Sequence, residues 1–211
     1  ATVACSSNFA NDYTDGIALQ TIKLVFQYLE KSVLTGDPEA REKIHNASTM
    51  AGMAFANAFL GMSHSMAHKI GGRFHTVHGR TNAILLPYVI RYNGTRPSKT
   101  TTWPKYNYWK ADEKFQDIAR MLGLPHSTPE EAVAAYAKAV YELGEKVGIK
   151  MNFKDQGIDE QEWKKYTHEL ALLAYEDQCS PANPRLPMVA DMEEIMNDAY
   201  YGYKERPGRI K

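Results

Sequence analysis

Residues 47–68 read ASTMAGMAFANAFLGMSHSMAH, a run of small and apolar side chains that ends with two histidines. The run shows no alternation of polar and apolar positions, so it predicts helix rather than strand. A helix that is small or apolar on every side is typical of a buried one, and its small residues let neighbouring helices or a ligand approach closely. The charged segment before it extends the predicted helix to residues 38–70.

The rest of the chain also predicts helices, with Thr14 or Asp15 as the expected cap of the first one. We expect Gly71-Gly72 to end the histidine-bearing helix, and Pro87 to kink the following helix or end it early. About seven helices are predicted in all. Besides 38–70, they cover about 14–32, a segment from 78 onward, 109–122, 128–147, 159–175 and 188–200. Since no run alternates like a strand, the predicted fold class is all-α, a single helical domain over residues 1–211.

Composition excludes several classes of protein. The 25 basic and 25 acidic side chains balance to a net charge of zero, which gives no general attraction to nucleic acid or to an anionic membrane. No apolar run approaches the roughly 18–20 residues of a membrane span. Cys5 and Cys179 are too few for a disulfide scaffold and favour a cytoplasmic protein. Neither a GxGxxG nor a GxxxxGK phosphate loop is present, and the proline-rich segment 95–108 predicts a loop.

Four of the seven histidines, His64, His68, His75 and His78, lie within fifteen residues. His64 and His68 are four positions apart, so on a helix both project from one face. A turn after that helix brings His75 or His78 back toward the pair. Converging imidazoles suit Zn, Fe, Ni or Cu. A lone histidine in a helix is more often a hydrogen-bonded core residue, but four together in a buried-looking segment favour a metal site.

The stretch GMSHSMAHKIGGRFHTVHGRTNAILLPYVIRYN, at 61–93, resembles the iron-dependent (group III) alcohol dehydrogenases. It is most similar to the C-terminal alcohol dehydrogenase part of the bifunctional aldehyde-alcohol dehydrogenases. NDYTDGIALQTIKLVFQYL, at 11–29, and DQCSPANPRLP, at 177–187, support the resemblance, which runs over almost the whole chain. It implies a helical C-terminal domain of the dehydroquinate synthase-like kind, which supplies most of a metal site while a separate α/β domain holds NAD(H).

The resemblance also implies roles for individual histidines. In this family Fe²⁺, or Zn²⁺ in some members, is held by an Asp, a His four residues later, and two histidines fourteen residues apart. His64 and His78 match the last pair and are the expected metal ligands. His68 matches a third histidine near the nicotinamide and substrate, so it is the expected catalytic proton relay, although its helical spacing alone would make it a ligand. His75 matches no family role.

One part of the family pattern is missing. Residues 1–30 contain no DxxxH pair, and the α/β domain has no counterpart in the chain. We therefore expect a fragment of a larger protein, inactive by itself, with NAD(H) bound mainly by a domain outside this chain. Phe55, Phe59 and Cys179 are candidates for lining the substrate pocket.

The expected function of the intact protein is NAD(H)-linked, metal-dependent interconversion of a short-chain primary alcohol, such as ethanol, and its aldehyde. The resemblance further implies self-association into oligomers or helical filaments. Two alternatives stay open. The first is a non-enzymatic helical metal-binding module that uses His64, His68 and His78 or His75. The second is a helical interaction or assembly domain whose histidines belong to the core.

Overall fold

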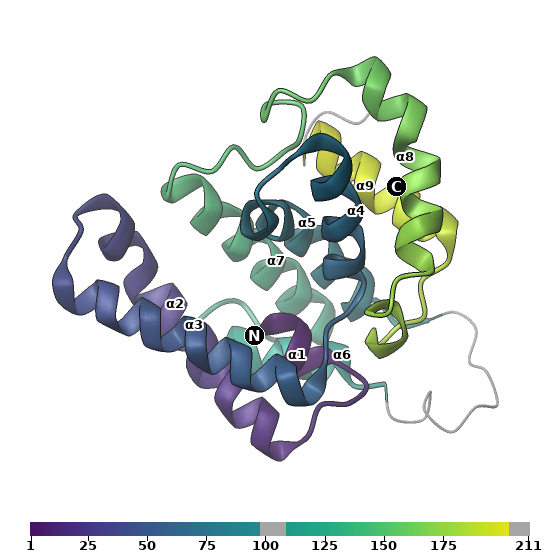
Figure 1. Ribbon diagram of the computed structural model, residues 1–211. Helices are drawn as coiled ribbons and strands as arrows, with labels where there is room; N and C mark the ends of the chain where they lie inside the picture. The colour runs from purple at the N-terminus through teal and green to yellow at the C-terminus, as the bar shows by residue number, and fades with distance from the viewer. Residues whose placement is uncertain (98–108, 203–211) are drawn as a thin grey trace.

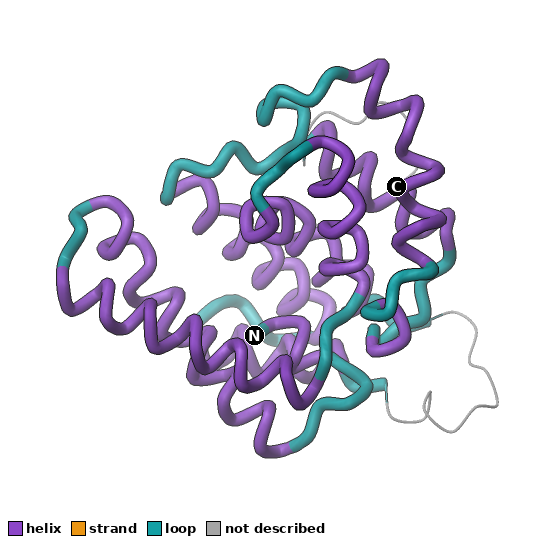
Figure 2. Tube along the Cα trace, viewed as in Figure 1, coloured by secondary structure: helices purple, strands orange, loops and turns teal. Residues whose placement is uncertain are grey.

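The computed structural model describes residues 1–97 and 109–202, and within them every regular element is helical, which confirms the predicted all-α class (Figure 2). Most of the predicted loop 95–108 lies outside the described residues. No described helix is both long enough and apolar enough to cross a membrane. The helices are α1 (Thr2–Ser6), α2 (Asp12–Leu34), α3 (Pro38–Ala58), α4 (Met62–Phe74), α5 (His78–Gly94), α6 (Ala111–Met121), α7 (Pro129–Lys146), α8 (Glu160–Tyr175), the 3-10 helix η2 (Ser180–Ala182) and α9 (Val189–Tyr201).

The predicted helix 38–70 is wrong in one respect, because the chain breaks into α3 and α4 at residues 59–61. Phe59 adopts a positive φ of 63°. Gly61 lies so close to Asn183 that a Cβ atom on it would be 2.7 Å from the Asn183 Oδ1. That same oxygen accepts a hydrogen bond from the Met62 N–H at 3.2 Å and so caps the start of α4. A distant side chain thus determines where the break falls.

The prediction that residues 47–68 are buried on every side is wrong for α3 and holds only in part for α4, where most of 62–67 is buried but His68 is exposed. In α3 the buried residues are four alanines on one stripe, Ala40, Ala47, Ala54 and Ala58. This stripe faces inward, and α3 packs mainly along α2. Opposite it, side chains such as Met53 are exposed. The small residues of α3 therefore permit close packing on one side only.

The expected end at Gly71-Gly72 is also wrong, and so is the early end that was one of two alternatives for Pro87. Gly71 and Gly72 lie inside α4, which continues to Phe74 and ends where His75 takes the left-handed conformation, with φ of 54°. Pro87 is buried inside α5 and does not end that helix.

The cap of α2 is Asn11 rather than Thr14 or Asp15. The Asn11 side chain accepts the Thr14 N–H at 3.1 Å, and the Thr14 hydroxyl accepts the Asn11 N–H at 2.9 Å. This reciprocal pair is a capping box, in which Thr14 occupies the third helical position.

The helices surround α5. Figure 1 shows the α2–α3 hairpin along one side of the molecule and α8–α9 along the other, with α5 and α7 between them. Helix α5 contacts α4, α6, α7 and α9. One hydrophobic core lies among α4, α5, α8 and α9, and includes Trp163 stacked on Phe153 and Tyr200. A second core joins α1, α2, α3, α6 and α7 to the far end of α5. Cys5 and Cys179 are both buried free thiols.

A glycine-to-alanine substitution tests the packing at the end of α5. A Cβ atom on Gly94 would lie 2.5 Å from Val133 Cγ2 on α7 and 3.1 Å from Phe115 Cδ2 on α6. We expect Gly94→Ala to lower the free energy of unfolding by about 1–3 kcal/mol, because overpacking displaces buried side chains. A Cβ atom added to Gly52, within α3, would have no neighbouring atom within 4 Å. Gly52→Ala should therefore raise the free energy of unfolding by about 0.5–1 kcal/mol. Urea unfolding of both variants checks this, and a stabilised Gly94→Ala protein would contradict the packing described.

Candidate metal and proton-transfer site

Three of the clustered histidines come together where α4 meets α5. His64 and His68 project from α4, residues 75–77 reverse the chain, and His78 is the first residue of α5. The ring centroids are 5.4 Å apart for His64 and His78, 5.3 Å for His68 and His78, and 6.3 Å for His64 and His68. His75 ends α4 and is exposed. The predicted convergence is therefore present, with His78 rather than His75 as its third member.

His64 has the properties of a metal ligand. Its Nδ1 atom is buried and has no hydrogen-bond partner among the described residues. Burial, followed by the neighbouring His78 and His68, lowers the pKa of His64 to about 4. The ring is therefore neutral at pH 7, which is the form that binds metal ions. A buried polar atom without a partner is unfavourable, and a bound ion next to this ring would relieve that.

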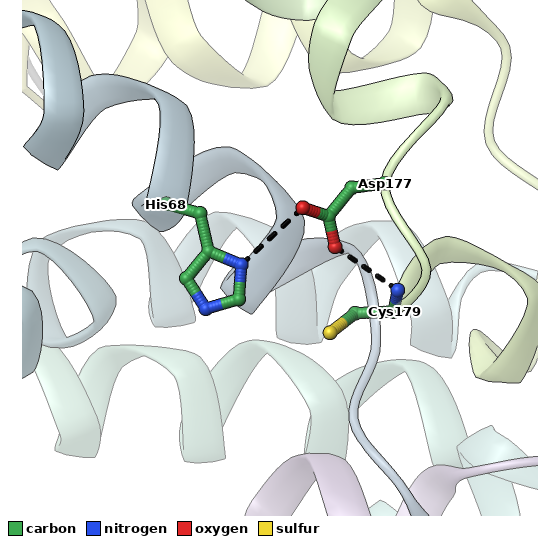
Figure 3. A group of neighbouring side chains, drawn as sticks. All are labelled: His68, Asp177 and Cys179. Carbon is green, nitrogen blue, oxygen red and sulfur yellow. Dashed lines mark hydrogen bonds and ion pairs between the residues drawn. The ribbon is translucent and has the colours of Figure 1, made fainter.

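His68 is linked to the loop that follows α8. Its Nδ1 atom lies 3.4 Å from Asp177 Oδ2, as Figure 3 shows. The same carboxylate oxygen receives the Lys69 ammonium at 2.8 Å, and Oδ1 accepts the Cys179 backbone N–H at 3.0 Å. Burial by itself would raise the pKa of Asp177, but the hydrogen bonds from Lys69, Cys179 and His68 lower it to about 2. Asp177 is therefore charged at neutral pH.

His68, Asp177 and Cys179 each offer one donor atom, and these three atoms lie within 4.8 Å of one another (Figure 3). Two features make this group a hydrogen-bonded cluster rather than a cation site. The Lys69 ammonium already occupies the carboxylate. Burial and the hydrogen bond to Asp177 raise the pKa of the Cys179 thiol to about 12, whereas metals bind the thiolate.

A largely apolar cavity of about 290 Å³ lies beside His64. Asn82 contributes polar atoms to its wall: its Oδ1 lies 3.0 Å from the Ser63 hydroxyl, and its Nδ2 lies 3.2 Å from His78 Nε2. The apolar side chains of the wall come from α2, α5 and α7 and include Ile22, Val25, Phe26, Leu86, Val140 and Leu143.

The three residues predicted to line a substrate pocket lie in different surroundings. Phe55 and Phe59 are each 39% exposed, and neither belongs to the wall of the cavity beside His64. Cys179 is buried next to Asp177 and His68. Asp177 was missed in the sequence, because 109 residues separate it from His68 and no local pattern joins them. The segment DQCSPANPRLP was the only signal that could have pointed to it.

The three histidines held by α4 and α5 form an arrangement suited to binding a metal ion. The family model for the C-terminal part of the Fe-containing alcohol dehydrogenase family matches residues 1–200. The chain therefore belongs to this family, which confirms the resemblance seen in the sequence.

Two individual proteins show what this chain is similar to within the family. The chain is 77% identical, over all 211 of its residues, to the Aldehyde-alcohol dehydrogenase of Streptococcus pneumoniae serotype 2 (strain D39 / NCTC 7466), and covers 24% of that protein. It is 41% identical over 203 residues to the Bifunctional aldehyde-alcohol dehydrogenase AdhE of Escherichia coli (strain K12), which pairs 93% of this chain with 23% of that protein. The chain thus spans about a quarter of the length of these relatives.

Solved structures agree with the fold. A 1,3-propanediol oxidoreductase superposes with a TM-score of 0.80 at 33% identity, covering 93% of this chain and 48% of that one. An alcohol dehydrogenase from Oenococcus oeni gives 0.81 at 32% identity, with the same coverage of both chains.

Proposed function

We propose that this chain is the helical, metal-binding part of a bifunctional aldehyde-alcohol dehydrogenase that interconverts ethanol, or another short-chain primary alcohol, and its aldehyde with NAD(H). The observation that carries the proposal is the convergence of His64, His68 and His78, together with the buried Nδ1 atom of a neutral His64 that has no hydrogen-bond partner among the described residues. Membership of the family supports the reaction type.

In this proposal His64 and His78 hold a divalent ion, Fe²⁺ first and Zn²⁺ as the alternative. The donor set fits either ion, because two imidazoles are good ligands for both. The aspartate and the further histidine of the family pattern would come from another part of the intact protein, as would most of the NAD(H) site. When bound, the ion supplies a Lewis acid that polarises the oxygen of the substrate.

The residues of this chain provide the proton transfer and the surroundings. The Nδ1 atom of His68 points to Asp177, so Nε2 is the atom left to take up a proton from the alcohol and return it to the aldehyde. Imidazole exchanges protons readily near neutral pH. The apolar wall of the cavity beside His64 would exclude water and accept a short alkyl chain.

The test is an assay of the intact protein that contains this chain. We expect ethanol-dependent reduction of NAD⁺ and acetaldehyde-dependent oxidation of NADH, both lost on treatment with a chelator and restored by Fe²⁺. Parallel assays with Zn²⁺, with NADP⁺ and with longer alcohols identify the preferred metal, cofactor and substrate. Bound metal without any alcohol-dependent reaction would contradict the proposal and favour the metal-binding module instead.

The remaining expectations stay predictions. Self-association into oligomers or filaments follows from the family resemblance. A cytoplasmic location follows from the composition.

A further inference from the structure

We propose that Asp177 is a positioning residue that acts through His68, fixing the orientation of the imidazole and the nitrogen that carries its proton. This inference rests on the proposed role of His68 in proton transfer. Asp177 lies just beyond α8, while His68 lies on α4, so the contact joins two elements that are distant in sequence.

The carboxylate of Asp177 is itself held in place. Its Oδ1 accepts the Cys179 backbone N–H at 3.0 Å, which ties the carboxylate to its own loop. The next residue of the loop, Ser180, is bound to α4: its hydroxyl lies 2.9 Å from the hydroxyl of Ser65, and both side chains are buried. Because this contact lies within one helical turn of His68, the loop presents Asp177 to His68 on a rigid support.

The contact favours one tautomer of His68. A charged carboxylate only accepts hydrogen bonds, so His68 must carry its proton on Nδ1 to bind Asp177. The Nε2 atom then has a free lone pair, as an acceptor of the alcohol proton requires. The ring of His68 also stacks on that of His78, with an interplanar angle of 17°. The carboxylate and the stacked ring together favour one orientation of this partly exposed imidazole.

Asp177→Asn removes the charge while keeping the shape of the side chain. An amide can also present an N–H to His68 Nδ1, which permits the opposite tautomer. In the intact protein we expect kcat to fall about 10–100-fold, with KM and metal content near those of the parent. If Asp177 acts through His68, Asp177→Asn should cause no further loss in a His68→Ala background, because the two effects are then not additive.

The surface pair of His168 and Glu193 provides a matched control. Here too a carboxylate oxygen lies near a histidine Nδ1, at 2.9 Å, but the pair joins α8 to α9 and includes none of the three histidines. Glu193→Gln should leave kcat, KM and metal content unchanged.

A second measurement does not depend on activity. Diethylpyrocarbonate reacts with an unprotonated imidazole nitrogen, and peptide mass spectrometry of the metal-free protein gives its rate at each histidine. We expect Asp177→Asn to slow the reaction at His68 and not at His168, and Glu193→Gln to do the reverse.

Two results would overturn the inference: equal losses of kcat from Asp177→Asn in the parent and in the His68→Ala background, or an unchanged modification rate at His68. A failure of the proposed function would give a different experimental result. If the parent protein oxidises no alcohol, the slower modification of His68 in Asp177→Asn still supports the positioning of the ring, and only the reaction assigned to it is lost.

Discussion

Replacing His64 or His78 with alanine is expected to remove most of the metal from the intact protein, whereas replacing His68 should leave the metal in place. His64 and His78 are the proposed ligands, and each substitution removes one imidazole from the coordination shell. His68 is expected to stay off the metal because it matches the family histidine that lies near the nicotinamide and the substrate. Metal stoichiometry, measured by elemental analysis on the three purified variants, distinguishes the two roles.

The turnover of these variants should not simply follow their metal content. His64→Ala and His78→Ala should lose activity in proportion to metal, while metal-loaded His68→Ala should lose about 10²–10⁴-fold in kcat, as is typical when a general acid–base group is removed. His75→Asn is the control: this exposed side chain lies outside the cluster, and asparagine tolerates the left-handed conformation found there. If His68→Ala lost metal while His64→Ala retained it, the ligand assignment would be wrong.

Local patterns predicted the features that depend on neighbours in sequence. The helices follow from continuous helical periodicity, and the pairing of His64 with His68 follows from their spacing of four residues. A short turn between adjacent helices can bring His75 or His78 to them, and the family resemblance selected His78. These parts of the site were therefore predictable before the fold was known.

The errors arise from contacts between distant segments. The break between α3 and α4 depends on Asn183, which is 121 residues from Met62 in sequence. Pairing of His68 with Asp177 likewise requires the loop after α8 to return to α4. The expected burial of residues 47–58 on every side is another such error, because α3 buries only the stripe of alanines. Composition indicates that a helix can pack closely, and only the tertiary structure decides which of its faces does.

Asn183 should accordingly be one of the most sensitive positions for stability. Its side chain is 3% exposed. The Oδ1 atom accepts hydrogen bonds from the Met62 N–H at 3.2 Å and the Asn93 amide at 3.3 Å. Its Nδ2 donates to Asn93 Oδ1 at 2.7 Å and to the Arg185 carbonyl at 2.6 Å. One buried amide thus joins the start of α4, the end of α5 and the loop before α9.

We expect Asn183→Ala to lower the free energy of unfolding by about 3–4 kcal/mol, because it leaves several buried polar groups without partners at about 1–3 kcal/mol each. Asn57→Ala is the matched control, since that exposed amide on α3 donates to the Met53 carbonyl of its own helix, and should change stability by less than about 0.5 kcal/mol. Urea unfolding of both variants measures the difference. Because Asn183 fixes α4 against the loop that carries Asp177, its loss should also loosen His68, so kcat should fall even where Asn183→Ala remains folded. Equal stability of the two variants would mean that the amide network does not hold α4 in place.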